Sequence, residues 1–226
     1  MEKVKNMIGN VIFDLGGVLL SVDWEKRFQQ CHLTGEKKEQ VGRATIFNPD
    51  WLLLDKGLPE DMIAEKMIRK EPEAEPEIRR FLESFSGVIR KRDYVETWIR
   101  NLKNAGLNVY VLSNFCQKAA KDNREELGFL TEMDGVVFSY ETGMIKPERE
   151  IYWHLLNEYQ LKPEECVFID DRVDNIEAGE REGIRGILFT SQGQASAELE
   201  KLLQIKLEKI DTVDSRKETE TGESTL

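Results

Sequence analysis

Several short apolar segments of this sequence are followed directly by polar side chains that could carry out chemistry. They are Asp14, Ser113, Asn114, Lys146, Asp170 and Asp171. Three of these residues are aspartates, and carboxylate oxygens are the ligands that Mg²⁺ prefers. A carboxylate beside such a metal can also attack phosphorus and form an aspartyl-phosphate. A serine hydroxyl can hydrogen-bond a phosphoryl oxygen, and a lysine ammonium can neutralise the charge that develops there. Together these residue types predict a metal-assisted site for phosphoryl transfer.

Taken singly, each of these residues has an ordinary structural explanation. An aspartate after a strand often caps a helix or a turn, and Ser113 or Asp170 could do the same. Their common position is what carries the prediction. In an open parallel sheet the carboxyl ends of the strands lie at one edge, and ligands bind there. Two adjacent carboxylates at a buried strand end also repel each other unless a cation is near.

The segments that must position these side chains alternate between strands and helices. Apolar, β-branched runs predict strands at 7–13, 108–112, 136–138, 167–169 and 186–189. Helical periodicity predicts a helix that stops at Gly106, one that ends near Gly128, and further helices at 148–160, 173–182 and 195–205. Such alternation is typical of an α/β fold with a doubly wound parallel sheet covered on both faces.

Residues 21–86 break this rhythm. Apolar stripes at helical spacing, with no convincing strand pattern, predict a small helical cap inserted after the first strand. The α/β core is then expected at 1–20 and 87–210. The last segment, 211–226, has almost no apolar residues and is predicted to be a disordered acidic tail.

Composition limits the class of protein and its partners. The chain of 226 residues is 40% hydrophobic and 33% charged, which is typical of a globular protein. Its formal net charge of −11 argues against nucleic acid and anionic membranes as partners. Three widely spaced cysteines predict no disulfide framework, and Asp14 interrupts the only apolar stretch that could pass for a signal peptide. We therefore expect a cytoplasmic protein, as a monomer or homodimer, whose partner is a small phosphorylated metabolite.

Four motifs in order resemble those of the haloacid dehalogenase superfamily of hydrolases. They are IFDLGGV at 12–18, VLSN at 111–114, IKPE at 145–148, and FIDD at 168–171 with Asn175. The likeness is greatest to the branch that contains α-glucose-1-phosphate phosphatase and the amino-terminal phosphatase domain of soluble epoxide hydrolase. This resemblance implies a Mg²⁺-dependent phosphatase, with sugar phosphates as the expected substrates.

The resemblance also implies roles for individual residues. Asp14 would be the nucleophile and a metal ligand. The Gly16 carbonyl and the carboxylates of Asp170 and Asp171 would complete the metal site, with their division of labour left open. Ser113, Asn114 and Lys146 would hold the phosphoryl group, with Lys146 taking part in catalysis.

One departure from the family pattern leaves alternatives open. Phosphatases of this family usually carry a second aspartate two residues after the nucleophile, where this chain has Gly16. Water, a cap residue or Asp23 could take over its acid–base role, although Asp23 is also well placed to cap a helix. The glycine also keeps open a 2-haloacid dehalogenase and a catalytically silent protein that binds phosphorylated metabolites. The acidic pair Asp170–Asp171 argues against the dehalogenase, which needs no metal.

Overall fold

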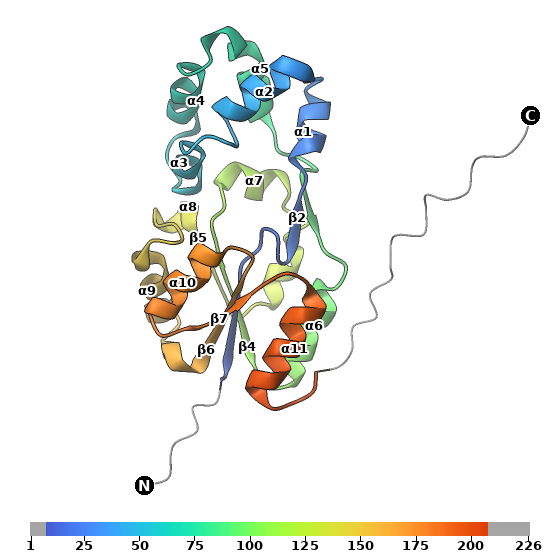
Figure 1. Ribbon diagram of the computed structural model, residues 1–226, viewed down its shortest axis with the longest axis vertical. Coiled ribbons are helices and arrows are strands. Elements are labelled where there is room, and N and C mark those ends of the chain that lie inside the picture. Colours follow the sequence, from blue (N-terminus) through green and yellow to red (C-terminus); the bar gives the residue numbers. More distant parts are fainter. Residues whose placement is uncertain (1–7, 208–226) are drawn as a thin grey trace, which may run out of the picture.

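A parallel sheet forms the centre of the computed structural model, which describes residues 8–207 (Figure 1). Within these residues the sheet has five strands in the order β5-β4-β1-β6-β7, and every neighbouring pair is parallel. The strands are β1 (Asn10–Phe13), β4 (Asn108–Ser113), β5 (Gly135–Phe138), β6 (Cys166–Asp170) and β7 (Arg185–Leu188). The first strand, β1, is central; β4 and β5 follow on one side of it, and β6 and β7 on the other. The predicted doubly wound α/β fold is therefore confirmed.

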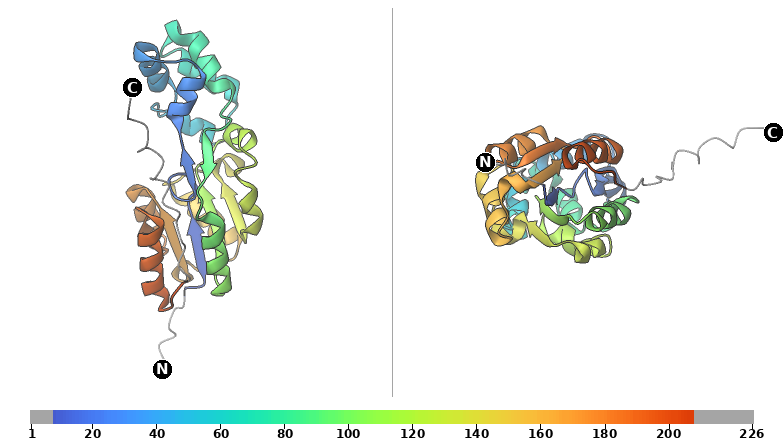
Figure 2. Two further views of the ribbon diagram at one scale, coloured as in Figure 1. Left: turned by 90° about the vertical axis from the view of Figure 1, so that its right-hand side faces the viewer. Right: turned by 90° about the horizontal axis from the view of Figure 1, so that it is seen from below.

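Alternate residues of the strands enter two separate hydrophobic cores. Val11 and Phe13 of β1 join the core that contains Trp98 and Leu199. Ile12, between them, joins the core that contains Tyr152 on the opposite face. Helices therefore cover the sheet on both sides, as Figure 2 shows. Burial on both faces is why the strands read as nearly continuous apolar runs in the sequence.

Four of the helices around the sheet agree with predicted segments, one is shorter than predicted, and the helix at 139–142 has no counterpart in the sequence prediction. The helices are α6 (Val95–Asn104), α7 (Gln117–Asp122), α8 (Ser139–Thr142), α9 (Arg149–Glu158), α10 (Val173–Arg181) and α11 (Gln192–Leu203), with short 3-10 turns η2 (Gly128–Glu132) and η3 (Pro163–Glu165). The predicted helix ending near Gly128 is wrong in length, because α7 ends at Asp122. The amide of buried Asn123 donates to the Ala119 and Phe85 carbonyls, at 3.0 and 2.9 Å. This side chain ends the helix and ties it to a distant segment.

A helical insertion, residues Trp24–Glu83, lies over the carboxyl ends of the strands (Figure 1). It consists of α1 (Trp24–Gln30), α2 (Gly35–Ala44), α3 (Trp51–Asp55), α4 (Glu60–Ile68), η1 (Pro72–Ala74) and α5 (Glu75–Glu83). Of these, α2 and α3 have no counterpart in the sequence prediction. The prediction that residues 21–86 hold no strand is also wrong. Strand β2 (Leu20–Val22) pairs antiparallel with β3 (Ile89–Lys91), and this ribbon connects the insertion to the sheet. Because its partner lies far along the chain, β2 has no local signal.

Three further observations concern expectations from the sequence. The cysteines Cys31, Cys116 and Cys166 are free and buried. No helix among residues 8–207 is long and apolar enough to cross a membrane. The predicted tail 211–226 and residue 7 of the predicted strand at 7–13 lie outside the described residues, and the strand itself begins at Asn10.

Asp23 caps a helix, which gives a first prediction. Its Oδ1 accepts a hydrogen bond from the Lys26 backbone N–H at 3.0 Å, at the start of α1. We expect Asp23→Ala to lower the free energy of unfolding by about 1 kcal/mol, as measured by urea denaturation. Asp23→Asn keeps an accepting oxygen and should lose little. A loss of activity at unchanged stability would instead assign Asp23 an acid–base role.

Candidate active site

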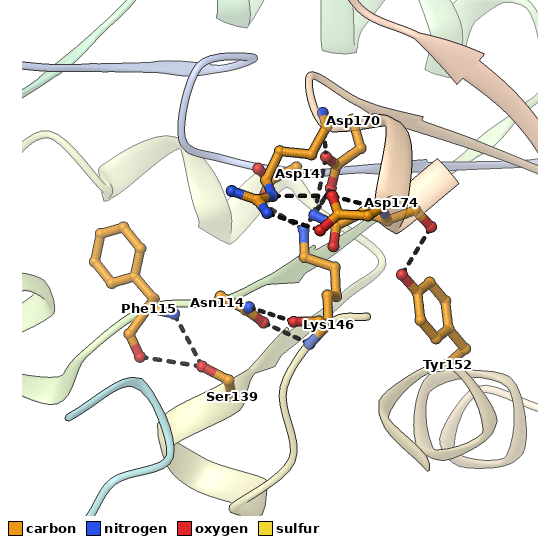
Figure 3. A network of polar contacts seen from close by, with 10 residues as sticks. Asp14, Asn114, Phe115, Ser139, Lys146, Tyr152, Asp170 and Asp174 are labelled. Atoms are coloured by element: carbon orange, nitrogen blue, oxygen red, sulfur yellow. Dashed lines mark hydrogen bonds and ion pairs between the residues drawn. The ribbon is translucent and has the colours of Figure 1, made fainter. Parts of the chain in front are cut away.

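The polar residues singled out in the sequence meet at the carboxyl edge of the central strands. Asp14 follows β1, Ser113 ends β4 and Asp170 ends β6. Strand β1 lies between the other two, with Phe13 opposite both Val111 and Ile169. Lys146 reaches the same place from the loop that follows α8 (Figure 3). The chain thus gathers this site from four separate segments at the point where the strand order reverses.

Lys146 is the electrostatic centre of the site. Its Nζ lies 2.8 Å from Oδ1 of Asp14 and 2.7 Å from Oδ2 of Asp170, and its side chain is 1% exposed. Burial alone would lower the pKa of this lysine, but the two carboxylates outweigh it and hold the pKa above its usual value. Lys146 therefore carries a positive charge at neutral pH and binds the two strand ends together.

The negative charge of the Asp14 carboxylate is only partly compensated by its neighbours. Burial raises the pKa of Asp14 to about 6, although the nearby Lys146 lowers it. The negative charge of Asp170 adds to the upward shift, and Ser113 opposes it. Only Oδ1 of Asp14 is paired with the lysine. A further cation at this carboxylate would therefore be favoured electrostatically.

Asp170 is saturated by donors from the protein. Besides Lys146, the Nδ2 group of Asn175 lies 3.0 Å from each of its oxygens, and the Arg172 backbone N–H lies 2.8 Å from Oδ1. The Tyr152 hydroxyl donates to the Asn175 carbonyl at 2.8 Å and fixes the start of α10 (Figure 3). Asn175 belongs to the quoted motif, but its contact with Asp170 could not be read from the sequence.

Asp171 lies against the loop that follows β1. A Cβ placed on Gly17 would come within 2.0 Å of Oδ2 of Asp171, and Gly17 has φ of +76°. Glycine is therefore required here both by the backbone conformation and by the close approach of the carboxylate. Burial and the charge of Asp170 raise the pKa of Asp171. Gly16, the other residue of this loop expected at the site, directly precedes this contact.

Three carboxylates at this edge form a set that fits a hard cation. One oxygen each of Asp14, Asp170 and Asp171 lie within 4.8 Å of one another. All donors are oxygens, and one lysine balances three carboxyl groups, so a divalent cation would complete the charge balance. Zinc would favour histidine or cysteine ligands, which this cluster lacks.

Asn114 and Ser113 differ in how their side chains are used. The Asn114 amide bonds reciprocally to the Lys146 backbone, accepting from its N–H at 2.8 Å and donating to its carbonyl at 2.9 Å (Figure 3). The amide group therefore holds the lysine segment rather than pointing to a ligand. The Ser113 hydroxyl is buried and has no hydrogen-bond partner of good geometry among the described residues. A buried hydroxyl in this condition is suited to bind an acceptor oxygen of a ligand.

One carboxylate near the site was not anticipated from the sequence. Asp55 ends α3 of the helical insertion and is buried, and it lies close enough to Asp14 for the two charges to repel each other. The sequence around it, WLLLDKG, offers no strand end and no family motif. Only the fold reveals that this residue faces the core.

Comparisons with known proteins agree with this fold and site. The family model of the haloacid dehalogenase-like hydrolases matches residues 8–183. A sesquiterpene phosphatase of Aspergillus oryzae is 27% identical over 201 residues, which cover 85% of this chain and 95% of that protein. A D-ribitol-5-phosphate phosphatase of Bacteroides thetaiotaomicron is 26% identical over 193 residues, covering 78% and 89%.

A solved structure shows the same fold. It is an enzyme of the haloacid dehalogenase family from Bacteroides thetaiotaomicron, crystallised as a complex with magnesium and inorganic phosphate. The TM-score is 0.64 at 23% identity, and the match covers 82% of this chain and 96% of the other. The family match spans most of the chain and includes every residue of the site. This protein therefore belongs to the haloacid dehalogenase-like hydrolases.

Proposed function

We propose that the chain is a Mg²⁺-dependent phosphatase that hydrolyses small phosphomonoesters through an aspartyl-phosphate on Asp14. The observation that carries the proposal is the position of the Asp14 carboxylate, which pairs with the buried ammonium of Lys146 and has an oxygen within 4.8 Å of oxygens of Asp170 and Asp171. One oxygen is held by the lysine, so the other can act as a nucleophile.

The metal ligands in this proposal are Asp14, the backbone carbonyl of Gly16 and Asp171. Asp170 supports them from behind, because its oxygens already accept from three donor groups and hold Lys146 in place. Bound Mg²⁺ would offset the repulsion between the carboxylates and the phosphoryl oxygens. A magnesium and phosphate complex of a family member with this fold supports the choice of metal.

Binding of the phosphoryl group falls to Ser113 and Lys146, with Asn114 positioning the lysine. The Ser113 hydroxyl, which makes no hydrogen bond of good geometry among the described residues, donates to one phosphoryl oxygen, and the lysine charge stabilises the negative charge that develops during transfer. Asp14 attacks phosphorus, the bond from phosphorus to the alcohol oxygen breaks, and that oxygen leaves with the electron pair. Water then attacks the phosphorus of the aspartyl-phosphate and restores the Asp14 carboxylate.

The helical insertion acts as a cap over this reaction in our proposal, with the core at 1–20 and 87–210 and the cap at 21–86. A pocket with about 750 Å³ of empty space, part of it open to solvent, lies between insertion and core. Its lining is Leu54, Leu58, Leu82, Phe85, Cys116 and Tyr140, together with polar residues such as Lys118. Leu54 adjoins Asp55, and Cys116 follows Ser113 in the loop after β4, so we assign this pocket to the leaving group.

Two classes of phosphomonoester fit this proposal. Sugar and sugar-alcohol phosphates are supported by the family resemblance and by the D-ribitol-5-phosphate phosphatase relative. The aliphatic and aromatic residues in the lining of the pocket, beside its polar ones, favour a less polar alcohol, such as the isoprenoid alcohols suggested by the sesquiterpene phosphatase relative. Free, buried cysteines support a reducing, cytoplasmic setting.

The test is phosphate release from a panel of sugar phosphates, alditol phosphates and isoprenyl phosphates, with Mg²⁺ and with EDTA. We expect release that requires Mg²⁺ and is restored by adding the metal back. The best substrate identifies the class of alcohol. Metal-independent release of halide from 2-haloacids would support the dehalogenase alternative, and binding without turnover would support the silent one.

A further inference from the structure

Asp55 is a buried carboxylate without a partner. It is 8% exposed, and no hydrogen bond or ion pair of its side chain occurs among residues 8–207. The neighbouring Lys56 does not pair with it, because the lysine Nζ lies 2.7 and 3.0 Å from the two oxygens of Glu148. Burying an unpaired carboxyl group costs stability, and the charged form costs far more than the neutral acid. Nothing in the packing of α3 accounts for an aspartate at this position.

The fold fixes Asp55 on the side of the insertion that faces the site. The ion pair of Lys56 with Glu148 ties the end of α3 to the start of α9. Gly57, with φ of +73°, approaches the Tyr140 carbonyl so closely that a Cβ would lie 2.3 Å from that oxygen. The end of α3 is thus packed directly on α8, as Figure 1 shows. The residues that flank Asp55 are thus fixed in place. Lys56 and Gly57 make the two contacts just described, and Leu54 lines the pocket assigned to the leaving group.

Electrostatics agrees with this placement. Burial raises the pKa of Asp55 to about 7, and the charge of Asp14 adds to the shift. Burial raises the pKa of Cys116, in the loop after Ser113, and the charge of Asp55 adds to this shift. Asp55 therefore lies close enough to interact electrostatically with both the candidate nucleophile and the loop beside the phosphoryl site.

The reaction needs a proton donor that the sheet does not supply. Gly16 has no side chain. Lys146 is paired with two carboxylates, and all the polar capacity of Asp170 is used to hold Lys146 and α10. The oxygen of an alkyl alcohol is a poor leaving group unless it is protonated as it departs. A group on the leaving-group side, outside the lysine network, would meet this need.

We propose that Asp55, reaching the site from the helical insertion, is the general acid and base of this enzyme. The inference rests on the proposed phosphatase function. As the bond from phosphorus to the alcohol oxygen breaks, the Asp55 proton moves to that oxygen and the alcohol leaves neutral. The Asp55 carboxylate then accepts a proton from the water that attacks the aspartyl-phosphate, so that inorganic phosphate is released and the acid form returns. The insertion thus supplies a function that the loop after β1 cannot.

The test compares Asp55→Asn with wild type on two kinds of leaving group. For the best alkyl phosphomonoester of the panel, we expect kcat/KM to fall about 10²–10⁴-fold. For p-nitrophenyl phosphate, whose phenolate leaves without a proton, the first turnover should keep its rate. Water activation is lost, so the variant should give a burst of about one p-nitrophenolate per protein and accumulate phosphorylated Asp14, detected in quenched samples by mass spectrometry.

A stability measurement provides a readout that does not depend on activity. Removing an unpaired buried carboxylate should leave the melting temperature of Asp55→Asn unchanged or raise it. Asp61→Asn, an exposed aspartate of the same insertion, is the matched control and should alter neither activity nor melting temperature.

The outcomes separate the two proposals. Equal loss on both leaving groups, with no burst and a lowered melting temperature, would reduce Asp55 to a structural residue and overturn the inference. Unchanged kinetics of Asp55→Asn beside an active wild type would also overturn it and leave the phosphatase standing. A wild-type protein that releases phosphate from no substrate would remove the phosphatase proposal, and the inference with it.

Discussion

We expect Asp14→Asn to abolish phosphate release while the protein stays folded, which would be the largest change in activity caused by a single substitution. An amide has the shape of the carboxylate but is neither a nucleophile for phosphorus nor an anionic metal ligand. Loss of a covalent nucleophile lowers kcat by about 10⁴–10⁶-fold. The measurement is phosphate release from the best substrate with Mg²⁺, together with mass spectrometry of quenched protein, where only wild type should gain a phosphoryl group.

Asp134→Asn is the control for this substitution. Asp134 is an aspartate that, like Asp14, pairs with a lysine, Lys103 at 3.0 Å, and it accepts from the Val109 backbone N–H at 2.8 Å, but it lies just before β5, away from the site. Its replacement should leave the activity within a few-fold of wild type. Residual activity of Asp14→Asn above about one hundredth of wild type would exclude covalent catalysis by Asp14. Unaltered activity of the variant would exclude the site itself.

The placement of the sheet residues could be predicted because it depends on local features. The strands that carry site residues, β1, β4 and β6, are short apolar runs buried on both faces, and the polar residue that follows the run must emerge at the carboxyl end. Parallel pairing then brings Asp14, Ser113 and Asp170 to one edge without any knowledge of side-chain contacts. The order of the four motifs supplied the family, which the match to residues 8–183 confirms.

The features that could not be predicted all depend on contacts between distant segments. Ser21 in β2 lies opposite Arg90 in β3, so the ribbon exists only once the insertion has folded back. Asn123 ends α7 because its amide bonds to Phe85, on the chain leaving the insertion. In the same way, the burial of Asp55 against the core depends on how α3 docks. Hydrophobic periodicity carries no information about such pairings.

The division of labour between Asp170 and Asp171 shows the same limit within the site. Adjacent carboxylates are equivalent in the sequence, and their backbone directions decide which one enters the protein. Asp170 points inward to Lys146 and Asn175, whereas Asp171 lies over Gly17 and is exposed. The resemblance to a family could therefore name the pair but not distinguish its members.

Lys146→Met should be the most destabilising of the substitutions at this site. The side chain is almost fully buried and pairs with Asp14 and Asp170, so its loss leaves two adjacent carboxylates without compensation. Removing one partner of a buried ion pair costs about 3–5 kcal/mol of the free energy of unfolding, which urea denaturation at neutral pH measures. Loss of its charge from the transition state should also lower kcat about 10²–10³-fold.

Magnesium should distinguish this effect from a simple loss of packing. A cation at the carboxylates replaces part of the missing positive charge, so Mg²⁺ should raise the melting temperature of Lys146→Met more than that of wild type. The matched control is Lys162→Met, because Lys162 forms a pair with Glu165 at 2.8 Å but is 67% exposed, and exposed pairs contribute about 0–1 kcal/mol. If both lysine variants lost equally little stability, or if Mg²⁺ shifted wild type and Lys146→Met alike, Lys146 would not be the charge that holds the acidic cluster together. A large loss for Lys146→Met that Mg²⁺ partly reverses would instead tie the stability of this fold to the cation site at its carboxyl edge.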